Sequence, residues 1–180
     1  YDLAMKTGAP VIGLIDSAGL RLQEATDALN AFGEIYLKQT LASGVIPQIT
    51  AIFGSCGGGL ALIPTLTDFT FMESSKAKLF VNSPNALDGN NVSKCDSASA
   101  QFQSSESGIV DIVADEAAIY AKVRELVSML PANNEDDASD EKCTDDLNRV
   151  CTDLENCVGD TSIALSTIAD NNVFFEVKEN

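Results

Sequence analysis

Histidine and tryptophan are both absent from this 180-residue chain, and basic residues are scarce. Without histidine there is no zinc site of the mixed cysteine and histidine type, and no catalytic triad that depends on an imidazole base. Eleven lysines and arginines stand against 27 aspartates and glutamates, which gives a net charge of −16. Because nucleic-acid binding depends on neutralising phosphates with basic side chains, this balance argues against a nucleic-acid partner.

Long apolar runs and paired cysteines are missing too. No run approaches the roughly 20 apolar residues that a membrane helix needs, and no signal peptide is recognisable, so we expect no direct membrane insertion. The cysteines lie at positions 56, 95, 143, 151 and 157, an odd number without a C-x-x-C pair. This usage predicts a reduced, cytoplasmic protein. The chain begins at Tyr1 inside a helix-like stretch, which predicts a fragment or a processed chain.

Acidic residues are concentrated in the segment NNEDDASDEKCTDD, residues 133–146. Such a charge run is typical of a solvated loop or of a surface that faces a partner. Its spacing lacks the D-x-D-x-D-G pattern and the terminal glutamate of a calcium-binding loop. We therefore expect no metal site in this chain.

Short apolar runs alternate with stretches of helical periodicity. The runs predict strands at 10–16, 46–54, 68–73, 78–83 and 173–177. The periodic stretches predict helices at 23–43, 58–66, 115–130 and 162–170. Strands that alternate with helices indicate an α/β protein with a mostly parallel sheet and flanking helices.

Two small-residue turns each follow a predicted strand, DSAGLRLQEA (16–25) and GSCGGGLA (54–61). Backbone N–H groups at a helix start are unpaired and carry the positive end of the helix dipole, so they suit an anion or a developing oxyanion. Two such turns on neighbouring strands would aim two amides at one point. Tight packing of helix on strand is the alternative explanation for the glycines.

Other glycine-dependent motifs do not match. The G-K-[ST] of a P-loop, the dinucleotide pattern G-x-G-x-x-G and the nucleophile elbow G-x-S-x-G are all absent from these turns. Cys56 lies beside the glycines but has no histidine to act as its base. A small packed residue is therefore the favoured interpretation of Cys56, and a nucleophile is the minor one.

The core of the chain resembles the carboxyltransferase components of biotin-dependent acyl-CoA carboxylases and decarboxylases. The likeness lies in DSAGLRLQEA (16–25) and in FGEIYLKQTLASGVIPQITAIFGSCGGGLALIPTLTDFTFM (32–72), and it continues through 107–134 and 168–180. It implies a crotonase/ClpP-like fold, a superhelix of ββα repeats. Residues 82–108 depart from the family's usual pattern, which suggests a decarboxylase sub-branch.

The resemblance also implies roles for the two turns. In the crotonase-like superfamily two backbone amides hold the thioester oxygen of an acyl-CoA, and they correspond here to Leu20 and Gly58. Arg21 would lie near the CoA, although a surface salt bridge or a contact at the helix start also explains it. Ala61 stands where hydratases of the superfamily carry a catalytic glutamate, which disfavours a hydratase. The implied residues are Leu20, Gly57, Gly58 and Gly59 for catalysis, and Ala18, Gly19, Arg21 and Cys56 for substrate binding.

The resemblance further predicts the organisation of the chain and its partners. Residues 1–134 would be the first half of a carboxyltransferase, incomplete at its start, 135–160 an acidic connection, and 161–180 a helix and strand that lead into a missing second half. Biotin on a separate carrier domain would exchange a carboxyl group with the α-carbon of an acyl-CoA through an enolate. A second half from a neighbouring subunit would complete the site of a homo-oligomer. Three interpretations stay open: a carboxylase, a decarboxylase that runs the same transfer in reverse, and a non-catalytic CoA-binding or assembly fragment.

Overall fold

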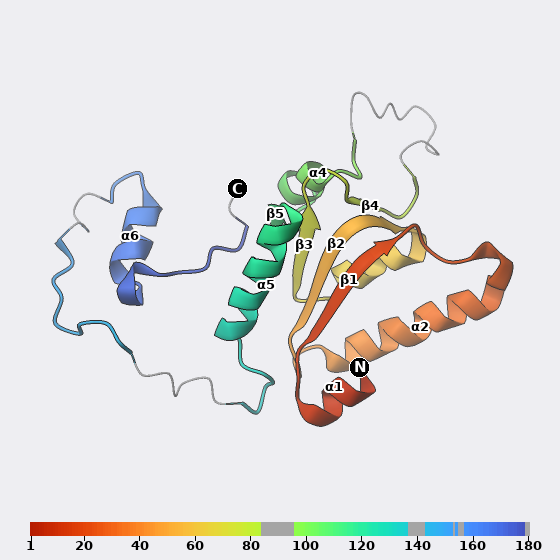
Figure 1. Ribbon diagram of the computed structural model, residues 1–180, viewed down its shortest axis with the longest axis horizontal. Helices are drawn as coiled ribbons and strands as arrows, with labels where there is room; N and C mark the ends of the chain where they lie inside the picture. Colours follow the sequence, from red (N-terminus) through yellow and green to blue (C-terminus); the bar gives the residue numbers. More distant parts are fainter. Residues whose placement is uncertain (84–95, 137–142, 153, 155–156, 179–180) are drawn as a thin grey trace. The chain divides into compact units, whose positions relative to one another are not determined.

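The computed structural model describes residues 1–83, 96–136, 143–152, 154 and 157–178 (Figure 1). Contacts divide the chain into two compact units, Tyr1–Asp136 with Val177–Asn180, and Asp137–Glu176. The first unit holds the β-sheet and the glycine turns. Cys95, most of the first half of segment 82–108 and part of the acidic segment lie outside the described residues. The predicted division at 134 and 160 is not tested and stays a prediction.

A parallel sheet forms the centre of the first unit, as predicted. Its strands lie in the order β1-β2-β3-β5, and β4 also pairs with β2. β2 is buried along most of its length, and it reads as a near-continuous apolar run because parallel strands are covered on both faces. The strands are β1 (Val11–Ser17), β2 (Gln48–Gly57), β3 (Phe69–Glu73), β4 (Lys78–Phe80) and β5 (Ile112–Ala114).

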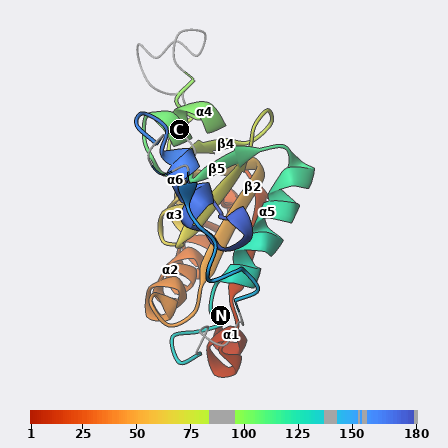
Figure 2. The ribbon, with the colours of Figure 1, turned by 90° about the vertical axis from the view of Figure 1, so that its left-hand side faces the viewer.

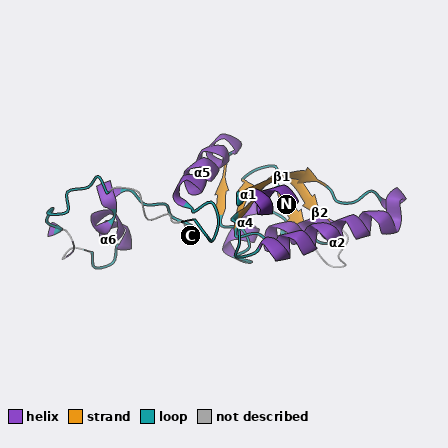
Figure 3. Cartoon of the chain, turned by 90° about the horizontal axis from the view of Figure 1, so that it is seen from below, coloured by secondary structure: helices purple, strands orange, loops and turns teal. Residues whose placement is uncertain are grey.

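Helices cover both faces of this sheet. α2 (Ala25–Ala42) and α3 (Leu62–Thr65) lie on one face, and α5 (Glu116–Met129) lies on the other (Figures 2 and 3). α5 begins where the Asp115 carboxylate accepts a hydrogen bond from the Ala118 N–H at 2.8 Å. Its buried residues, Ile119, Val123 and Leu126, recur at helical spacing and face the sheet.

Shorter helical segments complete the chain. The predicted helix 58–66 is one 3₁₀ turn, η2 (Gly58–Ala61), followed by α3. The predicted helix 23–43 is a 3₁₀ turn, η1 (Leu22–Glu24), followed by α2. α6 in the second unit confirms the helix predicted at 162–170. The remaining segments are α1 (Asp2–Thr7), η1 (Leu22–Glu24), η2 (Gly58–Ala61), α4 (Ala100–Ser105), α6 (Thr161–Ile168) and η6 (Asp170–Asn172).

β2 changes partner halfway along its length, and this change positions the glycines. Its first part, Ile49–Ile52, pairs with β3, whereas its last three residues pair with β4. Against β1, Ile15 lies opposite Ile52 and Ser17 lies opposite Cys56, so residues 53–55 of β2 form a bulge opposite a single residue of β1. Asp16 lies opposite this bulge, and its carboxylate accepts a hydrogen bond from the Ser55 N–H at 3.1 Å. Bulges of this kind bend a strand and redirect its end.

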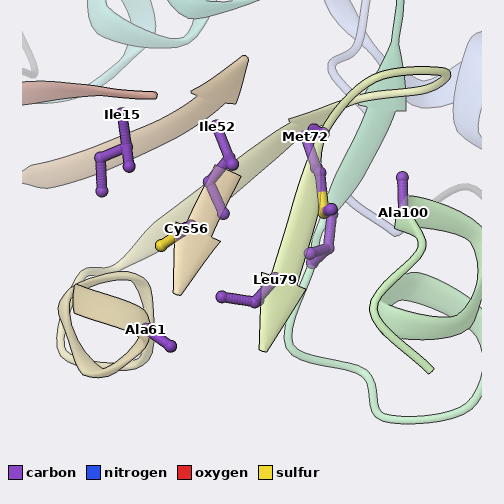
Figure 4. Close-up of a cluster of buried hydrophobic side chains, with 9 residues drawn as sticks. Ile15, Ile52, Cys56, Ala61, Met72, Leu79 and Ala100 are labelled. Carbon is purple, nitrogen blue, oxygen red and sulfur yellow. The ribbon is translucent and has the colours of Figure 1, made fainter. Parts of the chain in front are cut away.

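A buried hydrophobic cluster includes residues on both sides of the glycine run (Figure 4). Cys56 precedes the run and Ala61 follows it, and both side chains belong to the cluster, with 0% and 4% of their surface exposed. The core therefore anchors the backbone on either side of the three glycines. The cluster comprises Ile15, Ile52, Cys56, Ala61, Met72, Ala77, Leu79, Ala100 and Val110.

Several details of the predicted secondary structure differ in the structure, and one is that the strand predicted at 78–83 ends at Phe80. The strand predicted at 173–177 is an irregular segment. Val173 closes a 3₁₀ turn on Asp170, its side chain is 61% exposed, and no strand among the described residues pairs with this segment. β2 runs three residues beyond its predicted end at Gly54. α4 and β5 were not predicted. α4 has an N-cap at Ser99, and β5 has only three residues.

The second unit is held together around one arginine. The Arg149 guanidinium donates to the Asp145 carboxylate at 2.6 Å and to the backbone carbonyls of Thr167 and Ala169. These carbonyls lie at the end of α6, where a cation is favourable because of the helix dipole. The Asn171 N–H also donates to Asp145, at 3.1 Å.

Candidate functional site

The strand register brings the two predicted turns into contact. Ser17, the last residue of β1, pairs with Cys56 of β2, so the segments that follow them leave the sheet side by side. A methyl group placed on Gly19 would lie 2.9 Å from the Gly57 carbonyl oxygen. A methyl group placed on Gly57 would lie 2.8 Å from the Ala18 carbonyl oxygen and 2.8 Å from the Phe80 ring. The two backbones therefore approach more closely than any side chain allows.

Gly58 is the turning point between β2 and η2. Its φ of +64° lies in the left-handed region that favours glycine. Unlike its neighbours, it faces open space: a methyl group placed there would meet no described heavy atom within 4 Å beyond the adjacent residues. The side of Gly58 where a side chain would lie is therefore open among the described residues, and packing of helix on strand does not by itself explain this glycine.

Gly59 is held from α2. The Tyr36 hydroxyl donates a hydrogen bond to the Gly59 carbonyl oxygen, and a methyl group on Gly59 would lie 3.0 Å from that hydroxyl. Tyr36 stacks on Phe32, one turn earlier in α2, with ring centroids 6.0 Å apart. Close packing against this aromatic pair explains the third glycine of the run.

Cys56 is a buried thiol and not an activated one. Its side chain has no exposed surface, and its Sγ lies 3.6 Å from the Leu60 carbonyl oxygen. Burial raises the pKa of Cys56 to about 12, so the thiolate that a nucleophile requires is not formed near neutral pH. The side chain therefore packs in the core, as favoured above, and any contact between Cys56 and a substrate would involve its backbone.

The first turn is more exposed than the second. Gly19 and Leu20 are half-buried, whereas Arg21 projects into solvent. The Arg21 guanidinium pairs with the Glu24 carboxylate at 3.4 Å, with 82% and 56% of the two side chains exposed. A surface salt bridge was one of the explanations of Arg21 that sequence analysis left open, and an exposed pair of this kind contributes little stability.

Three residues of the site were not predicted from the sequence. Asp16 holds the bulge of β2, Tyr36 holds the carbonyl of Gly59, and Ala25 has a φ of +43°, which is strained for a residue with a side chain. Asp16 and Tyr36 act over 39 and 23 residues of sequence, and no local pattern indicates such contacts.

Among the described residues no cluster of three or more metal-ligating side chains occurs. Within the same residues, no helix has both the length and the apolar character required to cross a membrane.

The parallel sheet, the helices on both its faces and the two apposed strand ends define a crotonase-like α/β protein. More specifically, the chain belongs to the carboxyl transferase domain family, whose model matches residues 1–180. The resemblance inferred from the sequence is thereby confirmed.

Two relatives show the range of this similarity. The chain is 40% identical over 190 residues to the propionyl-CoA carboxylase carboxyltransferase subunit of Haloferax mediterranei, covering 99% of this chain and 37% of the relative. It is 38% identical over 187 residues to the methylmalonyl-CoA decarboxylase subunit alpha of Veillonella parvula, covering 98% and 37%. The chain thus spans less than two fifths of the length of these relatives.

A solved structure confirms the fold. The hexameric transcarboxylase 12S, with methylmalonyl-coenzyme A and methylmalonic acid bound, superposes with a TM-score of 0.88 at 32% identity. The match covers 98% of this chain and 36% of the transcarboxylase chain.

Proposed function

We propose that this chain is the acyl-CoA-binding part of a biotin-dependent carboxyltransferase. One observation carries the proposal: the two strand-end turns touch at Gly19 and Gly57, while the adjacent Gly58 faces open space. Membership of the carboxyl transferase domain family supports carboxyl transfer as the proposed activity.

The amides of Leu20 and Gly58 are the proposed donors to the thioester oxygen. Gly19 and Gly57 allow the two turns to approach each other, and Gly58 leaves room for the thioester. An acyl-CoA bound in this way acquires negative charge on its carbonyl oxygen when the α-carbon becomes an enolate. Fixed donors aimed at such an oxygen stabilise it by roughly 3–4 kcal/mol each, because they need no reorganisation during the reaction.

The chain's own contribution is to position and stabilise, and not to transfer protons. Cys56 keeps its proton, and histidine is absent. Biotin, when its carrier domain presents it, would supply or accept the carboxyl group, and its ring nitrogen would accept the α-proton in carboxylation and return it in the reverse direction. Residues 16–25 and 54–61 then hold the acyl-CoA in a fixed orientation, which removes much of the entropic cost of bringing two reactants together.

The direction of transfer has two candidates, each supported by a relative. Similarity to a propionyl-CoA carboxylase subunit favours carboxylation of an acyl-CoA. Similarity to a methylmalonyl-CoA decarboxylase subunit favours the reverse transfer from a carboxylated thioester to biotin. The same pair of amides serves both, because the enolate is common to both directions.

Partners are proposed on the same basis. Leu29, Leu37 and Leu41 lie on α2 and are 60%, 59% and 63% exposed, an apolar exposure that suits a protein contact. The transcarboxylase relative is a hexamer. We propose that a second half of the carboxyltransferase, from a neighbouring subunit of a homo-oligomer, completes the site, and that a biotin carrier visits it. A cytoplasmic location stays a prediction from the cysteine usage.

Carboxyl exchange tests the proposed function. The full-length protein would be incubated with methylmalonyl-CoA or malonyl-CoA as donor and free biotin as acceptor, and the loss of the carboxyl group from the thioester would be followed by mass spectrometry. Transfer that depends on both reactants is the expected result. Binding of acyl-CoA without any transfer in either direction would contradict the enzyme and would instead identify a CoA-binding or assembly module.

A further inference from the structure

The glycine run poses a physical problem for an oxyanion site. Gly57, Gly58 and Gly59 are consecutive, and glycine has more backbone freedom than any other residue. Donors stabilise a transition state well only when their direction is fixed before the reaction begins. Three successive glycines do not fix that direction by themselves, so their surroundings must restrain them.

The core restrains the run at its ends. Cys56 and Ala61 are buried in the hydrophobic cluster, and the last residue of β2, Gly57, is paired with Phe80 of β4. Between these anchors lie Gly58 and the first turn of η2. The Leu62 N–H closes this turn on the Gly59 carbonyl oxygen.

A side chain from outside the run reaches the same carbonyl oxygen. The Tyr36 hydroxyl donates to it from the middle of α2, 23 residues earlier in the sequence. Stacking on Phe32 fixes the Tyr36 ring, with an interplanar angle of 13°. Burial raises the pKa of Tyr36, which keeps the hydroxyl protonated as a donor.

We propose that Tyr36 is a positioning residue, which fixes the turn Gly58–Gly59 so that the Gly58 amide points at the thioester oxygen. The inference rests on the proposed function and assigns the task of preorganisation to one hydroxyl group. Tyr36 acts through the backbone and does not itself touch the substrate. Losing the hydroxyl would therefore loosen the glycine run and slow the chemical step, with little effect on how tightly the ground-state acyl-CoA binds.

Tyr36→Phe removes the hydroxyl and keeps the aromatic stack. Tyr120→Phe is the matched control: Tyr120 lies on α5, on the opposite face of the sheet, and stacks on Phe53 with centroids 5.0 Å apart. Both variants lose one phenolic oxygen, but only Tyr36 contacts the glycine run.

Amide hydrogen exchange tests the restraint independently of catalysis. Exchange in the peptide that covers residues 56–61 should be faster in Tyr36→Phe than in the parent protein, while Tyr120→Phe leaves it unchanged. This measurement needs no substrate, so it remains informative even if the protein transfers no carboxyl group. Unchanged exchange in Tyr36→Phe would overturn the inference.

Carboxyl-transfer kinetics test the consequence. In the full-length protein, Tyr36→Phe should lower kcat about fivefold, which corresponds to one neutral hydrogen bond, and change KM for the acyl-CoA by less than about twofold. Tyr120→Phe should leave both constants unchanged. If the parent protein is active and Tyr36→Phe has the same kcat, the positioning role is wrong. It is also wrong if Tyr36→Phe changes only KM for the acyl-CoA. A parent protein without transfer activity would count against the proposed function. Hydrogen exchange alone would then test whether the Tyr36 hydroxyl restrains the glycine run.

Discussion

Replacing Gly58 with alanine separates the two explanations of the glycine run. An alanine at φ +64° adopts the left-handed region, which costs roughly 1–2 kcal/mol relative to glycine. The new methyl group meets no described atom within 4 Å beyond the adjacent residues, so no clash adds to this cost. The free energy of unfolding should therefore fall by about 1–2 kcal/mol, and the domain should stay folded.

Activity should fall much further than stability. The methyl group would occupy the open space beside the Gly58 amide, where we place the thioester. Displacing the oxygen from one of two donors costs roughly 10²- to 10³-fold in rate in comparable sites. We expect a loss of this size in kcat for carboxyl transfer by the full-length protein.

Gly44→Ala provides the matched control. Gly44 follows α2, has a φ of +73°, and also faces open space. It should therefore suffer the same backbone strain without touching the site. Carboxyl exchange would be measured for both variants, with circular dichroism and thermal unfolding to compare their stability. If Gly58→Ala is folded and retains the activity of Gly44→Ala, the glycine serves the turn alone and the oxyanion hypothesis is wrong.

Three further predictions concern Cys56, Arg21 and Ala25. Burial raises the pKa of Cys56 from 9.0 to about 12, so between these values the folded chain keeps a proton that the unfolded chain releases, and the free energy of unfolding in urea should fall as the pH rises through that range. Cys56→Ala should reduce this pH dependence without loss of carboxyl transfer. Loss of transfer in a folded Cys56→Ala variant would instead indicate a chemical role for the thiol. Arg21→Ala should leave thermal unfolding nearly unchanged, because its salt bridge with Glu24 is exposed, but it should raise KM for the acyl-CoA. Glu24→Ala is the control, and an unchanged KM in both variants would show that Arg21 forms only the salt bridge and does not contact the CoA. Ala25→Gly should raise the free energy of unfolding by up to about 1 kcal/mol because it relieves a φ of +43°, and a lower melting temperature would refute the strain.

The strongly periodic elements of the fold were predictable from the sequence. α5 combines a helical spacing of buried residues with an N-cap aspartate, and β2 combines branched residues with burial on both faces. The errors lie where local pattern and tertiary pairing differ. VFFEV (173–177) has the composition of a strand, but no strand in the described part of the chain pairs with it, whereas β5 has only three residues and exists because β3 pairs with it.

The candidate site was predictable to the extent that it consists of turns. Small residues after two apolar runs indicated both turns, and the parallel register explains why they meet. The contacts that hold the turns were not predictable. Asp16 accepts a hydrogen bond from the bulge of β2, and the position of this bulge depends on the pairing of β2 with both β1 and β4. Tyr36 lies on α2, whose sequence is consistent with core packing alone and does not indicate a hydrogen bond to Gly59.

The location of the thioester oxygen tests the central claim most directly. A crystal structure of the full-length protein with a bound acyl-CoA would measure it. We predict that the oxygen lies at hydrogen-bond distance, about 2.7–3.2 Å, from the amide nitrogens of both Leu20 and Gly58. An acyl-CoA bound elsewhere, or held with its thioester oxygen directed away from these two amides, would contradict the account.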